Sequence, residues 1–222
     1  MSDQIDKFEN RTQAGKKLAG ALKDHKELIE QSIILAIPRG GVPVAYEVAN
    51  ELNIPFTLII TKKLTSPQNP EVAIGAIAPD GTYKINERTY SFLDISDDRF
   101  ERIKKEVLTN VKQRVEKYTD RKELNLEEKK VIIIDDGIAT GFTSLLAAKY
   151  ARKRGADKVV LAVPVALSSS ITTVKKAYDD VIFIISKGAF SIGAYYNDFH
   201  QNTDEELFDY IEKAKKKGLY YD

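Results

Sequence analysis

The stretch VIIIDDGIATGFTS occupies residues 131–144 and joins four β-branched apolar residues to two carboxylates and a loop of small and hydroxyl-bearing residues. The apolar run predicts a buried β-strand, so Asp135 and Asp136 fall at its carboxyl end. In open parallel sheets, ligands bind outside the carboxyl ends of the strands. This order of residues therefore predicts a binding site at the end of the strand, provided that the sheet is parallel.

Other short apolar runs predict the remaining strands of such a sheet. They are nearly continuous rather than alternating, which is typical of parallel strands that are buried on both faces. The predicted strands are Ser32–Ile37, Phe56–Thr61, Val131–Asp135, Lys158–Val163 and Val181–Ser186. The predicted helices are Val42–Leu52, Asp97–Tyr118, Gly141–Arg154, Ser168–Tyr178 and a last helix that starts at Thr203, where Glu206 completes a capping box, and ends near Gly218. We therefore expect an α/β fold with a doubly wound, mainly parallel sheet flanked by helices.

Residues 62–87 interrupt this alternation of strands and helices. The turn-forming residues of TSPQNP (65–70) mark a loop, and Asp80-Gly81 predicts a hairpin of two short strands. The regular pattern continues on both sides of this insertion. We therefore expect a single domain over residues 1–222, in which 62–87 form a mobile loop and hairpin.

The charge balance and the residue usage narrow the classes of partner. Lys and Arg total 34 against 33 Asp and Glu, and the resulting net charge of +1 argues for neither nucleic acid nor a membrane as a partner. The chain has no cysteine, which excludes disulfides and thiolate metal sites. No apolar run approaches the length of a membrane span, and the N-terminal residues lack a signal-peptide core. We expect a cytoplasmic protein.

The loop after Asp136 has the features of a phosphate-binding turn. A helix is predicted to begin near Gly141, and the free N–H groups and the dipole of a helix N-terminus favour an anion. Thr140, Thr143 and Ser144 add hydroxyl donors. Carboxylates beside a phosphate site suit the hydroxyl groups of a sugar phosphate, so this stretch predicts a sugar-phosphate site.

The same stretch has three other interpretations. The carboxylates can simply end the strand and hydrogen-bond the turn, which is what an isolated Asp-Asp pair would indicate. The acidic pocket of a receiver domain needs carboxylates on an early strand as well, and SIILAIPRGG (32–41) supplies none. A P-loop is disfavoured because no Gly-Lys-Ser/Thr follows the glycine.

A second candidate anion-binding loop is IPRGG (37–41), which follows the first predicted strand. Gly40 and Gly41 provide bare backbone amides, and Arg39 brings a guanidinium suited to phosphate. The alternative is an ordinary strand–helix turn with a surface arginine. Lys62 and Lys63 end the next predicted strand and suit a leaving anion, although solvated lysines would give the same pattern.

Side chains near the C-terminus are candidates for binding a flat acceptor. An aromatic group there can stack on a planar molecule, with core packing as the alternative, and Lys187 suits a carbonyl group on a base. The aromatic residues are Phe190, Tyr195, Tyr196 and Phe199. The two histidines, His25 and His200, lie in polar surroundings and are expected to be solvated or hydrogen-bonded and not to act as ligands or bases.

The stretch VIIIDDGIATGFTS resembles the phosphoribosyl pyrophosphate (PRPP) signature of the type I phosphoribosyltransferases. AIPRGGVPVA (36–45) matches the family's pyrophosphate loop, and TKKLTSPQNPEVAIGAI (61–77) stands in the place of its mobile catalytic loop. FSIGAYYNDFHQNTDEEL (190–207) is similar to the C-terminal part of a subgroup of predicted phosphoribosyltransferases without assigned substrates. The resemblance implies the type I fold, with a small C-terminal hood and helix over residues 187–222.

The resemblance also implies an activity, which is transfer of a phosphoribosyl group from PRPP to a nitrogenous base-like acceptor, with release of pyrophosphate. Mg²⁺ would be bound mainly through PRPP, so we expect no protein metal site. The loop Lys62–Ile74 would close to exclude water. The implied catalytic residues are Asp135, Asp136, Lys62 and Lys63.

The resemblance also implies which part of PRPP each predicted binding segment would contact. The implied substrate-binding residues are Arg39, Gly40 and Gly41 for pyrophosphate, Asp135 and Asp136 for the ribose hydroxyls, and the loop Gly137, Ile138, Ala139, Thr140, Gly141, Phe142, Thr143 and Ser144 around the 5-phosphate. We expect a homo-oligomer, and a dimer before any larger assembly. The main alternative is a regulatory protein that binds PRPP or a nucleotide without catalysis. A sugar-phosphate hydrolase with Asp135 as nucleophile is a further one.

Overall fold

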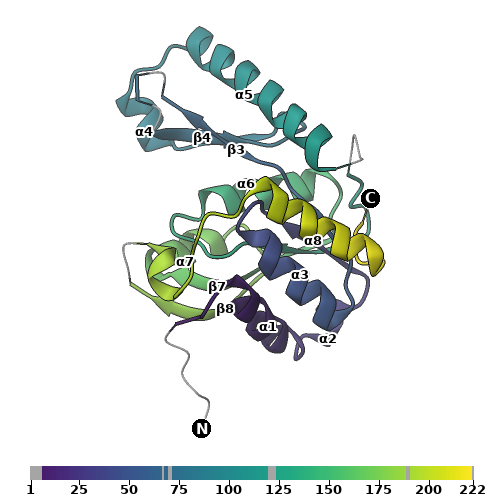
Figure 1. Cartoon of the computed structure of the whole chain (residues 1–222). Coiled ribbons are helices and arrows are strands. Elements are labelled where there is room, and N and C mark those ends of the chain that lie inside the picture. Colours follow the sequence, from purple (N-terminus) through teal and green to yellow (C-terminus); the bar gives the residue numbers. More distant parts are fainter. Residues whose placement is uncertain (1–6, 67, 70–71, 120–123, 189–190, 222) are drawn as a thin grey trace.

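Five parallel strands form the main sheet of the protein, whose computed structural model describes residues 7–66, 68–69, 72–119, 124–188 and 191–221 (Figure 1). The strands are β1 (Ser32–Ala36), β2 (Phe56–Leu58), β6 (Lys130–Ile134), β7 (Lys158–Leu167) and β8 (Asp180–Lys187). Their order across the sheet is β2-β1-β6-β7-β8, and every neighbouring pair is parallel. The predicted parallel sheet is confirmed.

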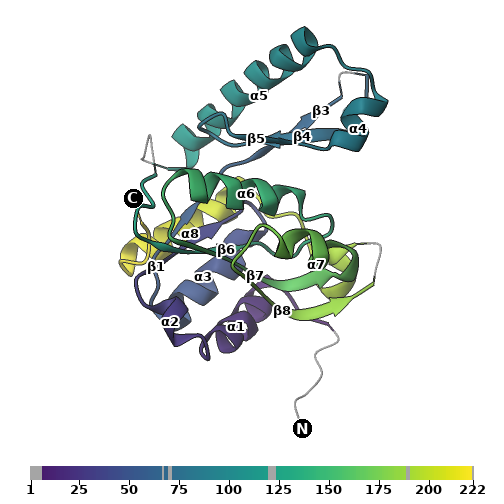
Figure 2. The same cartoon turned by 180° about the vertical axis from the view of Figure 1, so that it is seen from behind.

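Helices cover both faces of this sheet, as Figures 1 and 2 show from opposite sides. One face carries α1 (Arg11–Leu22), α3 (Gly41–Leu52) and α8 (Asp204–Lys216), and the other carries α6 (Phe142–Lys153) and α7 (Ser168–Lys175). In β6, Ile132 and Ile134 belong to the first core, whereas Val131 and Ile133 belong to the second. Because both faces are buried, the strand reads as a continuous apolar run.

A second, smaller sheet stands over α6 as a separate lobe (Figure 1). Its antiparallel strands are β3 (Lys62–Thr65), β4 (Ala73–Ile77) and β5 (Tyr83–Ile85), and α4 (Glu87–Phe92) and α5 (Asp97–Tyr118) pack against it. The hairpin predicted around Asp80-Gly81 is the β4–β5 pair. Lys153 of α6 reaches Asp80 at 3.0 Å, and this ion pair ties the hairpin to the main body.

The predicted strands and helices differ from the observed ones mainly at their ends. β2 ends at Leu58 rather than Thr61. The Ile59 N–H still donates to Ala36 O at 3.0 Å, but the chain then leaves the sheet and enters β3, which pairs with β4 and was not predicted. β7 is longer than predicted and continues to Leu167.

Three helices were not predicted: α1 and α2 (Lys26–Ile29) in the N-terminal part of the chain, and α4 in the second lobe. A local signal for α1 is present, because the Asn10 side chain accepts the Gln13 N–H and so caps the helix. A short 3₁₀ helix, η1 (Ile192–Tyr195), precedes the segment that leads to α8. Within the described ranges, no helix combines the length and apolarity that crossing a membrane requires.

Two phenylalanines allow a matched test of this packing. Phe56 of β2 is fully buried and meets Tyr220 edge-on, with ring centroids 5.6 Å apart, whereas Phe92 is 86% exposed. We expect Phe56→Ala to lower the free energy of unfolding by about 3–5 kcal/mol. The same change at Phe92 should alter it by less than about 0.5 kcal/mol. Urea denaturation measures both, and equal effects would contradict the placement of β2.

Candidate functional site

Two loops lie side by side at the carboxyl ends of β1 and β6. The strands pair in parallel with Ala36 opposite Ile134, and the Ile37 N–H donates to Ile134 O at 2.9 Å. The β1–α3 loop (37–41) and the β6–α6 loop (135–141) therefore leave the sheet at the same edge. The structure thus brings together the two loops for which the sequence predicts anion binding.

The contact between these loops is so close that it requires glycine in the β1–α3 loop. A Cβ atom at Gly40 would lie 2.1 Å from Oδ2 of Asp136, and one at Gly41 would lie 2.7 Å from Ile134 O. Gly40 has an ordinary helical φ of −61°, so space rather than backbone conformation excludes a side chain there. The missing side chains bring the backbone of one loop against the carboxylates of the other.

The β6–α6 loop ends where α6 begins. Gly141 has a φ of 72°, in the left-handed region that favours glycine, and Phe142 is the first helical residue. The first N–H groups of a helix have no carbonyl partner within it, so they and the helix dipole attract an anion. Ala139 and Thr140 are exposed at this turn. The turn thus has the features of an anion site.

Ser144 lies inside this turn rather than at its open side. Its side chain is buried, and its hydroxyl donates to Gly141 O at 2.8 Å. The Tyr178 hydroxyl in turn donates to Ser144 O at 2.5 Å. In this structure Ser144 therefore stabilises the turn, and Thr140 and the half-buried Thr143 are the hydroxyls nearer its open side.

The adjacent carboxylates have unusual electrostatics. Burial and then the negative charge of Asp136 raise the pKa of Asp135 well above its ordinary value. Burial also raises the pKa of Asp136, while the Arg11 guanidinium acts in the opposite direction. Oδ1 of Asp135 accepts the Asp136 N–H at 2.9 Å. A carboxyl whose pKa is raised in this way can exchange a proton nearer to neutral pH, which is a common property of catalytic groups.

Arg11 is a site residue that the sequence analysis missed. Its Nε and Nη2 atoms each lie 2.8 Å from Oδ2 of Asp136. The two residues are 125 positions apart and come from α1 and the end of β6. No local pattern marks this pair, because only the folded sheet brings α1 to the end of β6.

The C-terminal segment completes this side of the site. The Tyr196 hydroxyl donates to Asp136 O at 2.6 Å, and the backbone pairs with the N-terminal segment through a bridge between Phe8 and Tyr196. Tyr195 and Tyr196 are buried, so in this structure they pack in the core instead of facing a flat acceptor. Phe190 lies outside the described residues.

The Arg39 side chain reaches α8. Its Nη1 atom lies 3.2 Å from Oδ1 of Asp204, a carboxylate that also accepts hydrogen bonds from Lys117 at 2.5 Å and from the Tyr118 hydroxyl at 2.7 Å. These contacts, with Lys117 first and Tyr118 second, lower the pKa of Asp204 to about 2. Two cations therefore share one carboxylate beside the β1–α3 loop, and the Arg39 guanidinium there is of a kind that suits an anion.

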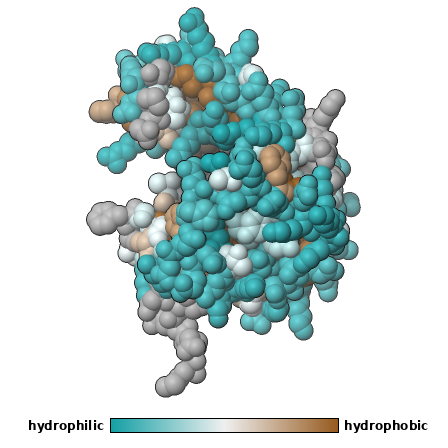
Figure 3. All heavy atoms as spheres, in the orientation of Figure 1, coloured by the Kyte–Doolittle hydropathy of each residue, from teal (hydrophilic) through white to brown (hydrophobic). Residues whose placement is uncertain are grey.

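Lys62 and Lys63 lie on β3 of the second lobe, where they pair with Ile77 and Ala76 of β4. Pro67, Pro70 and Glu71, near the tip of the predicted closing loop, lie outside the described residues. The surface is hollowed between the second lobe and the main body, on the side where β7 runs into α7 (Figure 3). The carboxyl ends of the main strands are on this side.

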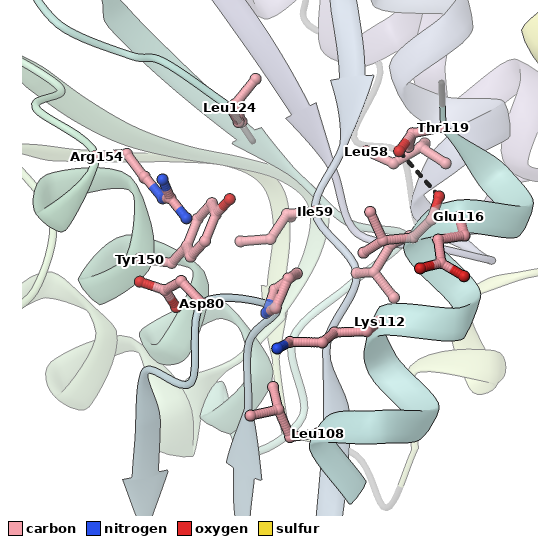
Figure 4. A pocket seen from close by; sticks show the side chains of 13 residues that line it. Leu58, Ile59, Asp80, Leu108, Lys112, Glu116, Thr119, Leu124, Tyr150 and Arg154 are labelled. Atoms are coloured by element: carbon pink, nitrogen blue, oxygen red, sulfur yellow. Dashed lines mark hydrogen bonds between the residues drawn. The ribbon is translucent and has the colours of Figure 1, made fainter. Parts of the chain in front are cut away.

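A cavity of about 510 Å³ lies between α5 and the C-terminal end of α6 (Figure 4). Ile59 and Tyr150 contribute buried walls, and Lys112 and Glu116 lie on the α5 side. Tyr150 is about 12 Å along α6 from Phe142. Among the described residues that line the cavity, none belongs to either loop, so it is distinct from the site.

Comparisons with known proteins agree with this geometry. The sequence signature of the phosphoribosyl transferase domain matches residues 1–197. A Mycobacterium tuberculosis protein, known from strains CDC 1551 and H37Rv, is 33% identical over 211 residues, and its name assigns it provisionally to the phosphoribosyl transferases. The match covers 94% of this chain but 47% of that protein, so the chain spans about half the length of the curated relatives it matches.

A solved structure is also similar to this chain over most of its length. The protein TT1426 of Thermus thermophilus is 30% identical, with a TM-score of 0.76 over 93% of this chain and 98% of that one. The fold and the two loops define a type I phosphoribosyltransferase architecture, as predicted. The chain belongs to the phosphoribosyl transferase family, whose signature covers most of its length.

The contact between Gly40 and Asp136 generates a testable prediction. Gly40→Ala places a methyl group 2.1 Å from Oδ2 of Asp136, and such overpacking costs about 1–3 kcal/mol of unfolding free energy. Gly20 of α1 is the matched control, since a Cβ there would meet nothing within 4 Å. Gly20→Ala should instead raise the unfolding free energy by about 0.5–1 kcal/mol. Chemical denaturation that shows no difference between the variants would refute the close contact.

Proposed function

We propose that this phosphoribosyl transferase uses PRPP as its donor and a nitrogenous base-like small molecule as its acceptor, and that it releases pyrophosphate. The observation that carries the proposal is the parallel pairing of β1 with β6, which places a helix N-terminus, two carboxylates and a glycine loop at one edge. PRPP presents a phosphate, ring hydroxyls and a diphosphate in that same order. The arrangement of groups therefore supports a phosphorylated ribose donor.

Each segment of the site would bind a different part of PRPP. The N-terminus of α6 and the threonines near it, Thr140 and Thr143, would bind the 5-phosphate. Asp135 and Asp136 would accept hydrogen bonds from the ribose hydroxyls. The β1–α3 loop, with Arg39 beside it, would bind pyrophosphate.

The proposed reaction is a displacement at C1 of the ribose. The lone pair of an acceptor nitrogen forms the new bond to C1, while the C1–O bond breaks and its electron pair leaves with pyrophosphate. Bond breaking runs ahead of bond making, so positive charge develops on the ribosyl ring. The carboxylates stabilise that charge, and Asp135, with its raised pKa, is suited to take the proton that the acceptor nitrogen loses.

Mg²⁺ would be bound mainly through the donor. Asp136 is already paired with Arg11, and Asp135 accepts a backbone N–H. Both carboxylates therefore have partners in the protein, which fits a Mg²⁺ ion that is held by oxygens of PRPP and by water. When bound, the ion would neutralise charge on the leaving pyrophosphate. The protein's own contribution to that charge would come from Arg39 and from the amides of Gly40 and Gly41.

Two further parts of the proposal concern the whole molecule. The segment 62–74 would close over the hollow in Figure 3 and exclude water, bringing Lys62 and Lys63 toward pyrophosphate. The protein would act in the cytoplasm, in nucleotide metabolism, as a homo-oligomer and most simply as a dimer.

Calorimetry with PRPP and Mg²⁺ tests the donor, and a pyrophosphate-release assay with a panel of purine and pyrimidine bases tests the reaction. We expect binding of PRPP and release of pyrophosphate with at least one base. Binding without release for any base would favour a regulatory protein that binds PRPP or a nucleotide. Absence of binding would refute the donor, and a phosphoenzyme on Asp135 would indicate a hydrolase.

The carboxylates can be tested one at a time. Asp135→Asn and Asp136→Asn should each weaken PRPP binding or turnover about tenfold or more, because each removes a charge-assisted contact worth about 1.5–3 kcal/mol. Asp136→Asn should also destabilise the fold by about 1–3 kcal/mol, since Arg11 loses its ionised partner. Asp157→Asn, an exposed change just before β7, is the control. Wild-type binding and turnover in both site variants would remove the carboxylates from the mechanism.

A further inference from the structure

The Arg11 guanidinium is held on three sides within the folded chain. Its Nη1 atom donates to His200 O at 2.8 Å, and its central carbon lies 4.0 Å from the centre of the Phe199 ring. Its Nε and Nη2 atoms contact Asp136, and the side chain is only 8% exposed. A buried arginine that is held by several such contacts has one orientation, in contrast to a surface arginine that forms a transient ion pair.

This arrangement also restricts the Asp136 carboxylate. Arg11 contacts Oδ2 from one side, and Gly40 backs the same oxygen so closely that even a methyl group would overlap it. Both Arg11 contacts fall on Oδ2, so neither of them involves Oδ1. A carboxylate that is fixed before the ligand arrives binds it without the entropy cost of ordering a side chain.

The charge on Arg11 matters as much as its shape. Asp136 sits beside Asp135, and two carboxylates in a buried place repel each other. Arg11 from α1 contacts the Asp136 carboxylate, the Tyr196 hydroxyl donates to the Asp136 backbone oxygen, and the Gly40 backbone lies against Oδ2. Of these, Arg11 is the group that carries positive charge.

We propose that Arg11 is a positioning residue, which holds the Asp136 carboxylate in place as the acceptor for a ring hydroxyl of the ribose phosphate. The inference rests on the proposed function, because it assigns the hydroxyl groups of the donor to this carboxylate. Arg11 itself acts through Asp136 and not on the reacting atoms. The segment that carries it would then contribute to sugar recognition as well as to the fold.

A pair of probes separates sugar recognition from phosphate binding. Ribose 5-phosphate carries the ring hydroxyls, and tetrahydrofurfuryl phosphate has the same ring and phosphate without them. Wild-type protein should bind ribose 5-phosphate more tightly by calorimetry. Arg11→Met should lose about tenfold to a hundredfold of its affinity for ribose 5-phosphate and keep its affinity for tetrahydrofurfuryl phosphate.

Two conservative variants and one control accompany this experiment. Arg11→Lys retains the charge but not the fork, so its preference for ribose 5-phosphate should lie between wild type and Arg11→Met. Phe199→Leu removes the ring beneath the guanidinium and should reduce the preference slightly. Arg102→Met changes an exposed arginine of α5 and should leave it unchanged.

The possible results distinguish a failure of the proposed function from a failure of the role proposed for Arg11. Equal affinity of the wild type for the two probes would refute hydroxyl recognition at this site, and with it the proposed function. A wild-type preference that Arg11→Met retains would overturn the inference alone. An equal loss of affinity for both probes in Arg11→Met would show that Arg11 only maintains the fold. Tighter binding of ribose 5-phosphate by Arg11→Met would show that Arg11 competes with the sugar. Either result would overturn the inference.

Discussion

The parallel pairing of β1 with β6 is the constraint on which the rest of the site depends. It places Ala36 opposite Ile134 and so releases two loops from the same edge of the sheet. Because the loops start side by side, Gly40 and Gly41 can lie directly against Asp136 and Ile134. A shift of one residue in this register would turn every side chain of β6 to the other face of the sheet and separate the carboxylates from the glycine loop.

Placing two carboxylates at a buried strand end is electrostatically unfavourable, and the fold compensates for it locally. The Asp136 N–H donates to Asp135, and a guanidinium from α1 lies on Asp136. The same burial that makes the pair costly raises the pKa of Asp135, which is the property that proton transfer requires. Stability and proposed chemistry therefore arise from one arrangement, as is common at functional sites.

An N-terminal segment around Phe8 and a segment around Tyr196 meet at this site. Phe8, just before α1, pairs with the end of η1 and the residues after it, where the Phe8 N–H donates to Tyr195 O and the Asn197 N–H donates to Phe8 O, both at 2.8 Å. Arg11 and Tyr196 then reach Asp136 from these paired segments. The start of α8 also supplies Asp204, which holds Arg39. These segments consequently hold side chains of the site in place.

The sequence by itself determined the features that depend on neighbouring residues. The apolar run of β6, the carboxylates at its end, the helix after Gly141 and the Thr203 capping box of α8 all follow from periodicity, backbone preference and hydrogen bonds within a few positions. Only the tertiary structure decided that β3 joins the β4–β5 hairpin, that Arg11 pairs with Asp136, and that Asp204 holds Arg39 across 165 positions. The physical reason is that such contacts depend on which strands become neighbours, and an isolated arginine or aspartate carries no local sign of its distant partner.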